Sequence, residues 1–129
     1  EWSWLMGRAE RILKRDVGET RRKLFTHSEN HGIWRERGIA YDEMWSDFTP
    51  KLRSSRFWPQ CERIKAAVSL RETRAADEAV TALFRYLDTP VPGLWFDRWM
   101  EDGSFPRDVP AKSSSLYHII GALAEYVRG

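Results

Sequence analysis

Apolar residues recur every three or four positions in five segments of this chain, and that spacing predicts a mainly helical fold. The expected helices cover residues 1–15, residues 19–31, a stretch that opens at Pro59 and includes Val68, residues 72–87, and residues 113–127. Proline is accepted in the first turn of a helix, and Gly32 suits the end of the second helix. Ser113 to Ser115 are good residues for the start of the last one.

Two aromatic-rich segments between the helices resemble each other. Residues 38–42 read GIAYD and residues 93–97 read GLWFD, an offset of 93 − 38 = 55 residues, and Asp47 matches Asp102 at the same offset. A repeat of helix, helix and short hairpin is typical of stacked helical pairs. Two unrelated turns would also give these letters, and the sequence leaves that alternative open. We expect short β-hairpins near residues 39–51 and 95–105, the second at the Asp102-Gly103 turn.

Composition narrows the class of protein. The 129 residues carry a net charge of +2, from 21 basic and 19 acidic residues that are interspersed along the chain. Arginine is frequent, but without a basic run nucleic-acid binding is not expected. The apolar runs are far shorter than the roughly 20 residues that span a bilayer, so no membrane is expected. Cys61 is the single cysteine, which excludes an internal disulfide and indicates a reducing, cytoplasmic setting.

No metal or cofactor site is expected. His27 and His31 lie four residues apart, but HSENH lacks the glutamate that follows the first histidine of a zinc-protease helix, which favours a surface pair. No glycine-rich phosphate loop occurs. Cys61 lies on the apolar stripe of its helix, so we interpret it as a packing residue and not as a nucleophile.

His118 is the most informative polar residue of the last helix. At 100° per residue it lies about 160° from the centre of the stripe formed by Leu116, Ile120 and Leu123. We expect that stripe to be buried and His118 to lie on the opposite face, where Gly121 and Ala122 leave room for a ligand. A plain surface histidine fits the same pattern.

The segment from Arg56 to Ala66, RFWPQCERIKA, is the densest in functional side chains. Four of them suit a polyol substrate because they combine a cation, a flat apolar face and hydrogen-bonding oxygens: Arg56, Trp58, Gln60 and Glu62. A helix start fixed by Pro59 explains the same residues without a ligand. Among the seven tryptophans, Trp58 and Trp95 are the candidates to stack on a sugar ring.

The chain begins in the middle of a helical pattern, without a capping residue before it. We therefore expect it to be a piece of a longer protein. Four segments, taken in order, resemble motifs of the N-acylglucosamine 2-epimerase superfamily: EWSWL, RFWPQCERIKA, GLWFDRWMEDGSF and PAKSSSLYHI. This superfamily includes mannose isomerases and mannose-6-phosphate isomerase-like proteins. The resemblance covers nearly the whole chain.

The resemblance implies an all-α fold, part of an (α/α)6 barrel with short β-hairpins in its loops. Residues 1–129 would be the C-terminal part of a single catalytic domain whose N-terminal part is absent. It also implies a histidine acid/base pair for isomerisation or 2-epimerisation of a hexose such as mannose. His118 matches the second histidine of this pair. The first histidine would lie three residues before Glu1, and Glu1 would be the glutamate that orients that first histidine.

By the same resemblance Arg56, Trp58, Gln60 and Glu62 would line the sugar pocket, with Trp95 as a further candidate, and no cofactor is required. The expected partners are a small-molecule sugar, the missing part of the barrel and a second copy in a homodimer. We expect the fragment alone to be inactive and to expose apolar surface. A catalytically silent member of the fold that binds a carbohydrate or a protein remains the alternative function.

Overall fold

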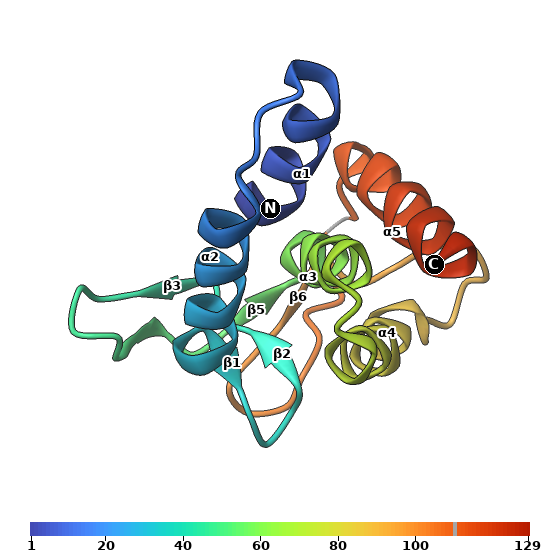
Figure 1. Cartoon of the computed structure of the whole chain (residues 1–129). Coiled ribbons are helices and arrows are strands. Elements are labelled where there is room, and N and C mark those ends of the chain that lie inside the picture. The colour runs from blue at the N-terminus through green and yellow to red at the C-terminus, as the bar shows by residue number, and fades with distance from the viewer. Residues whose placement is uncertain (110) are drawn as a thin grey trace.

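The structure is a computed structural model that describes residues 1–109 and 111–129; Pro110, the first residue of PAKSSSLYHI, lies outside them. The described residues form five α-helices, one 3-10 turn and three pairs of short strands (Figure 1). The helices are α1 (Trp2–Leu13), α2 (Gly18–His31), α3 (Phe57–Leu70), α4 (Thr73–Leu87) and α5 (Leu116–Arg128), with the 3-10 turn η1 (Ser113–Ser115) before the last. The expected mainly helical fold is confirmed.

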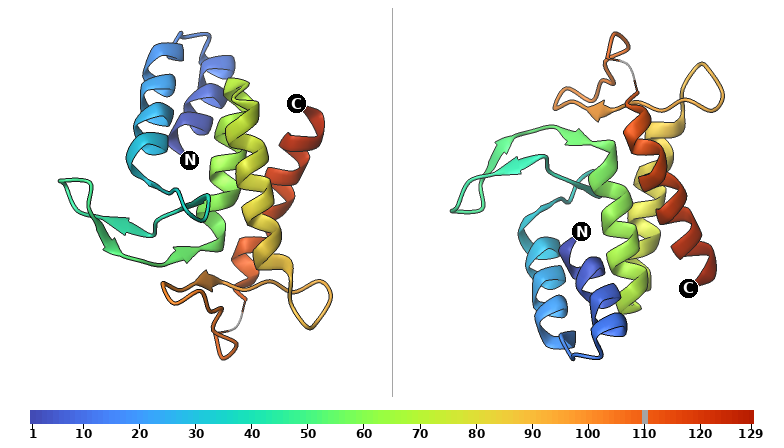
Figure 2. Two further views of the ribbon diagram at one scale, coloured as in Figure 1. Left: turned by 90° about the horizontal axis from the view of Figure 1, so that it is seen from below. Right: turned by 90° about the horizontal axis from the view of Figure 1, so that it is seen from above.

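Helix α3 lies at the centre of the molecule, between α1 and α2 on one side and α4 and α5 on the other (Figures 1 and 2). Ten of its 14 residues are buried, including charged ones, because it has neighbours around most of its circumference. Its fully buried Phe57, Cys61 and Ile64 form a core with residues of α4 and α5. Burial raises the pKa of the Cys61 thiol to about 12, so the thiol stays protonated and packs as expected.

One buried arginine fixes α3 to its neighbours. Arg63 donates two hydrogen bonds to the carboxylate of Glu29 on α2, at 2.7 and 2.8 Å. It also donates to the carbonyl oxygen of Gly38, at 2.8 Å, and contacts Glu78 on α4. The paired carboxylates offset the cost of burying the guanidinium, so this cluster sets the positions of α2 and α4 around α3.

The strands gather at the end of the helical layer where α3 begins (Figure 2). They are β1 (Ile33–Trp34), β2 (Ile39–Ala40), β3 (Glu43–Met44), β4 (Pro50–Leu52), β5 (Ser55–Arg56) and β6 (Arg98–Trp99). β1 pairs with β2, β3 with β4 and β5 with β6, all antiparallel. The hairpin of β3 and β4 lies in the region expected for the first hairpin, and the pair of β1 and β2 was not expected.

The second expected hairpin, near residues 95–105, is wrong in its pairing. The tight turn is present, since the amide of Met100 donates to the carbonyl oxygen of Ser104 at 2.9 Å. β6, however, pairs with β5 and not with the segment after the turn. Phe105 instead stacks on Trp99 and Phe96, at ring-centroid distances of 5.0 and 4.7 Å. Aromatic packing thus takes the place of a second strand.

The 55-residue repeat extends to the helices and to the backbone hydrogen bonds. α1 begins at Trp2 and α3 at Phe57, an offset of 57 − 2 = 55 residues. The same offset separates the starts of α2 and α4, at residues 18 and 73, and the starts of β3 and β6, at residues 43 and 98. In the turn of residues 45–49, the backbone amide of residue 45 donates to the carbonyl oxygen of residue 49, and the amide of residue 48 donates to the carbonyl oxygen of residue 45. In the turn of residues 100–104, the amides of residues 100 and 103 make the same two bonds, to the carbonyl oxygens of residues 104 and 100. The repeat is therefore structural, and α5 takes the place of the first helix in a third unit.

The buried faces of α1 and α5 differ from those expected. On α5, Ile119 and Ala122 are buried, whereas Leu116 and Ile120 are 48% and 60% exposed. On α1, small residues are buried and most of the apolar stripe is exposed, including Trp2, Ile12 and Leu13. α1 therefore packs inward through small side chains and α5 through Ile119 and Ala122, and both helices leave large apolar side chains uncovered. His118 lies on the packed side of α5, not opposite it.

Gly32 ends α2, but not in the left-handed conformation that glycine usually supplies there, since its φ is −90°. A Cβ at this position would lie 2.8 Å from the carbonyl oxygen of Ser28, so the requirement for glycine is one of space.

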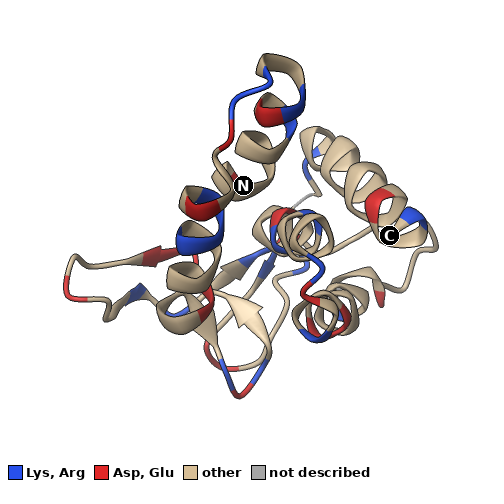
Figure 3. Ribbon diagram, in the orientation of Figure 1, with Lys and Arg blue, Asp and Glu red and all other residues tan. Residues whose placement is uncertain are grey.

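Among the described residues, no helix is long and apolar enough to cross a membrane. Figure 3 shows acidic and basic residues interspersed over the helices, in agreement with the near-neutral charge.

Candidate active site

A histidine and a glutamate from different helices meet between α3 and α5. Nδ1 of His118 lies 2.6 Å from Oε1 of Glu62, and the two side chains are only 12% and 3% exposed. His118 occupies the first turn of α5, and Glu62 lies on the face of α3 that α5 covers. The interpretation of His118 as a plain surface residue is therefore wrong.

Lys65 completes a buried charge cluster. Its Nζ lies 2.6 Å from the same Oε1 of Glu62, and its side chain is 6% exposed. The ammonium group also lies 4.2 Å from the ring centroid of Trp4 on α1, a favourable cation–π distance. Lys65 supplies the positive charge that a buried carboxylate requires. With Lys65 as its ion-pair partner, Glu62 acts as an acceptor, so Nδ1 of His118 is the donor in their hydrogen bond.

A pocket of about 330 Å³ opens beside the imidazole. It is lined by Glu1, Arg56, Trp58, Asp97, Lys112, Ser114, Ser115, Tyr117 and His118. The indole of Trp58 flanks the imidazole, with 5.6 Å between ring centroids. Glu1, Trp58 and His118 lie where α1, α3 and α5 begin, so the pocket forms where the first helices of the repeated units start. Helix starts carry partial positive charge and favour anionic oxygens.

Arg56 is held toward this pocket by a buried aspartate. Asp42, whose side chain is 1% exposed, accepts hydrogen bonds from the backbone amide and Nε of Arg56, at 2.7 and 2.9 Å. Its other oxygen accepts from Ser54 at 2.6 Å. The guanidinium carbon lies 5.7 Å from the ring centroid of Trp58. Arg56 is thereby restrained at one wall of the pocket, with part of its side chain accessible.

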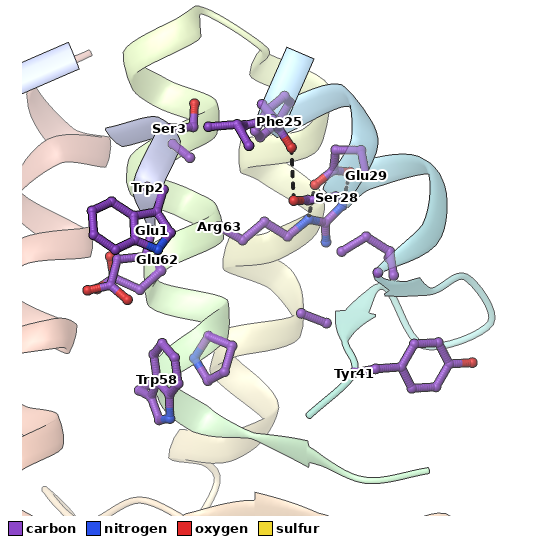
Figure 4. A pocket seen from close by; sticks show the side chains of 16 residues that line it. Glu1, Trp2, Ser3, Phe25, Ser28, Glu29, Tyr41, Trp58, Glu62 and Arg63 are labelled. Carbon is purple, nitrogen blue, oxygen red and sulfur yellow. Dashed lines mark hydrogen bonds and ion pairs between the residues drawn. The ribbon is translucent and has the colours of Figure 1, made fainter. Parts of the chain in front are cut away.

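A second pocket, of about 320 Å³, borders the start of α3 (Figure 4). It shares Glu1 and Trp58 with the first pocket and is also lined by Glu62 and Trp2. Glu62 therefore contacts His118 and also borders this cavity. The two cavities together bring five of the seven predicted site residues to one region: Glu1, Arg56, Trp58, Glu62 and His118.

The other two predicted residues lie elsewhere. Gln60 is fully buried, and its amide exchanges hydrogen bonds with the backbone of Ala40, at 2.8 and 3.3 Å, while donating to Ser55 at 2.7 Å. Trp95 stacks on Phe57 and lines a separate cavity of about 240 Å³. Neither borders the His118 pocket, and their roles in binding remain predictions. His27 and His31 pack against Phe48, away from this site.

Three residues around the site were not predicted from the sequence. Lys65 follows Glu62 by three positions, a spacing that places both on one side of a helix, so a signal for their pairing was present. Asp42 and Asp97 were noticed only as matching letters of the repeat. Their burial depends on strands and turns that come together from distant parts of the chain, for which there is no local signal.

Chemically, the arrangement suits proton transfer. A neutral imidazole that donates from Nδ1 keeps a lone pair on Nε2, which is a base near neutral pH. Arg56 and the helix starts can hold oxygen atoms that gain negative charge, and Trp58 offers an apolar face to a sugar ring. Within the described residues, no three acidic, histidine or cysteine side chains gather as a metal site would require.

The family model of N-acylglucosamine 2-epimerase (GlcNAc 2-epimerase) matches residues 1–122 of the chain. The chain belongs to this family, as its motifs indicated. It is also similar to a curated mannose-6-phosphate isomerase of Rhizobium meliloti (strain 1021), with 36% identity over 136 aligned positions. The alignment covers 97% of this chain and 35% of that relative, so the chain spans about a third of the relative's length. No solved structure gives a significant match.

Proposed function

We propose that this chain is part of a sugar isomerase or 2-epimerase in which His118 transfers a proton at C1 or C2 of a hexose such as mannose. The observation that carries the proposal is the buried contact of 2.6 Å between Nδ1 of His118 and Oε1 of Glu62. Family membership and the similarity to a mannose-6-phosphate isomerase support the same reaction class.

The reaction follows from the chemistry of these groups. Nε2 of His118 removes the proton on C2, the carbon next to the sugar carbonyl, and the electron pair moves onto the carbonyl oxygen O1 to form an enediolate. Arg56 and the helix starts stabilise that oxygen as it gains charge. For isomerisation, the proton of the C2 hydroxyl passes to O1 and the proton held by His118 returns to C1, which gives the ketose. Return of a proton to the opposite face of C2, while the carbonyl at C1 re-forms, gives the epimer.

A second histidine is part of this proposal by the family resemblance. It would lie three residues before Glu1, and Glu1 would orient it. Glu1 already borders both cavities near His118, which supports a place for this helix start in the site. Two histidines would allow one to act as base while the other acts as acid.

We also propose that residues 1–129 form the C-terminal part of one helical-barrel domain. The 55-residue repeat, the uncovered apolar stripes of α1 and α5, and the 35% coverage of the relative all support a longer helical array. Such repeated units bury their remaining faces against further units.

The test uses the complete protein that contains this chain, incubated with mannose in heavy water. NMR follows product formation and deuterium at C2 for wild type and for His118→Ala. We expect the variant to lose both by at least about a hundredfold while keeping its circular dichroism spectrum, because loss of a catalytic acid/base costs two or more orders of magnitude.

His31→Ala is the matched control, since His31 packs against Phe48 away from the pocket, and we expect it to keep wild-type activity. If wild type exchanges no deuterium into mannose, mannose 6-phosphate or N-acylglucosamine, the enzyme proposal fails. The chain is then better explained as a silent carbohydrate-binding or protein-binding member of its family.

A further inference from the structure

Asp97 is a buried carboxylate on the wall of the His118 pocket, and the reaction described above does not use it. The residue is 5% exposed and lines the cavity of about 330 Å³ together with Arg56, Trp58 and His118. None of the described residues donates a hydrogen bond to its carboxylate or lies within ion-pair distance of it. Among the described residues, only the indole nitrogens of Trp4 and Trp95 are fully enclosed without a partner, so the Asp97 oxygens are reached from the cavity and can accept hydrogen bonds from a ligand there.

The repeat offers an internal comparison. Asp42 occupies the equivalent position one unit earlier, since 97 − 42 = 55. Its carboxylate accepts hydrogen bonds from Ser54 and from the amide and Nε of Arg56. Asp42 therefore has a structural role with filled acceptor positions. Asp97 has the same place in its unit without those partners, and it lines a cavity instead.

The backbone of Asp97 fixes this carboxylate relative to the rest of the pocket. Its carbonyl oxygen accepts a hydrogen bond of 2.9 Å from the amide of Phe57, at the start of α3. Trp58 is the next residue, and its indole flanks the imidazole of His118. This backbone bond thus fixes Asp97 next to the start of α3, where Trp58 contacts the proposed base His118.

We propose that Asp97 is a substrate-binding residue whose carboxylate accepts hydrogen bonds from hydroxyl groups of the sugar. The inference rests on the proposed function and names the part of the substrate that this wall contacts. A carboxylate can accept from two neighbouring hydroxyls, and it repels phosphate. The portion of the substrate held at Asp97 is therefore the neutral polyol, and any phosphate lies away from it.

The test compares wild type and Asp97→Asn in the complete protein. Asparagine keeps the shape and the backbone bond to Phe57 but removes the charge, and charged hydrogen bonds are the stronger ones. We expect KM for mannose to rise roughly 10- to 100-fold with kcat within about threefold, because uniform binding is lost. The melting temperature should not fall, because no described residue donates a hydrogen bond to the carboxylate that is changed.

Asp102→Asn is the matched control: Asp102 is exposed, and its acceptor role toward the amide of Ser104 can be filled by the asparagine oxygen. We expect it to keep the wild-type KM. Asp97→Ser serves as a second variant if the asparagine amide does not fit. An unchanged KM in both Asp97 variants, or a lower melting temperature with unchanged kinetics, overturns the proposal and makes Asp97 structural.

Titration calorimetry with mannose separates this inference from the proposed function. If the wild-type protein binds mannose without turning it over, the enzyme proposal fails, while weaker binding by Asp97→Asn still supports the role of Asp97. If turnover is present and neither KM nor binding responds to Asp97, the role of Asp97 fails alone. If the wild-type protein neither binds nor converts mannose, both are overturned.

Discussion

At the scale of single residues, Glu62 stands out because one of its oxygens serves two donors. Oε1 lies 2.6 Å from both Nδ1 of His118 and Nζ of Lys65, and all three side chains are largely buried. Such a cluster is stabilising only while its charges balance. It links the proposed base to α3 and, through the contact of Lys65 with Trp4, to α1.

We predict that Lys65→Met destabilises the protein by about 3 kcal/mol, because it leaves Glu62 without its buried cation. Urea denaturation of the complete protein measures the change. Lys51→Met is the matched control: Lys51 pairs with Glu43, but both side chains are 44% exposed, so its loss should cost less than about 1 kcal/mol. Equal effects of the two substitutions would show that the buried cluster contributes no more than a surface pair.

At the scale of elements, helix positions follow closely from the sequence, and strand pairing does not. The apolar spacing predicted all five helices, most of them to within two residues at each end, because helical contacts are local. The pairing of β5 with β6 joins residues 55–56 to 98–99, and no local pattern specifies a partner so far along the chain. The buried side of α5 was predicted in part: Ile119 and Leu123 of its apolar stripe pack on the core. Leu116 and Ile120 of the same stripe are exposed, because the small Ala122 takes the buried position instead.

The candidate site was predictable to a similar degree. His118, Glu62, Arg56 and Trp58 were named from residue type and family resemblance, and the structure brings them together. Their mutual geometry was not predictable, since it depends on how α5 packs on α3. Asp97 was missed as a binding candidate because its position beside His118 depends on distant segments that come together in the fold.

The turn at the end of each repeated unit provides a test at this scale. Gly103 has a φ of +86°, and a Cβ added there would meet only the end of Arg37, at 3.9 Å. We predict that Gly103→Ala lowers the free energy of unfolding by about 1 kcal/mol through backbone strain alone. The same substitution at Gly121, inside α5, should instead raise it by about 0.5 kcal/mol.

Thermal or urea unfolding of the two variants provides the comparison. The Cβ of Gly121→Ala would lie 3.8 Å from Cδ of Lys65, an ordinary contact, so no steric cost is expected. The two substitutions are chemically identical, and opposite signs are therefore the diagnostic result. A stabilising Gly103→Ala would contradict the left-handed conformation of that turn.

At the scale of the whole molecule, two helices present large apolar side chains to solvent. On α1, Trp2, Ile12 and Leu13 are 71%, 78% and 69% exposed, and on α5, Ile120 and Val127 are 60% and 84% exposed. Exposed apolar surface of this kind is a site of association. The expectation that the chain exposes apolar surface is confirmed.

We predict that residues 1–129, expressed alone, self-associate as concentration rises. Sedimentation velocity over a wide concentration range measures this, and the double variant Ile12→Glu with Ile120→Glu should shift the distribution toward monomer. Glu19→Gln, a change at an exposed charged position on α2, is the control and should leave association unchanged. A monomer at all concentrations with a sharp melt would contradict the prediction.

The two turns of the repeat have one further consequence. Residues 38–49 and 93–104 share only three identical letters in twelve, Gly38 with Gly93, Asp42 with Asp97 and Asp47 with Asp102, yet residues 45–49 and 100–104 repeat the same backbone bonds. Descent from a duplicated ancestor would leave this kind of trace. In one copy the aspartate accepts hydrogen bonds from Ser54 and Arg56, and in the other it lines the cavity beside His118, so one turn geometry supports two different surroundings for the same residue type.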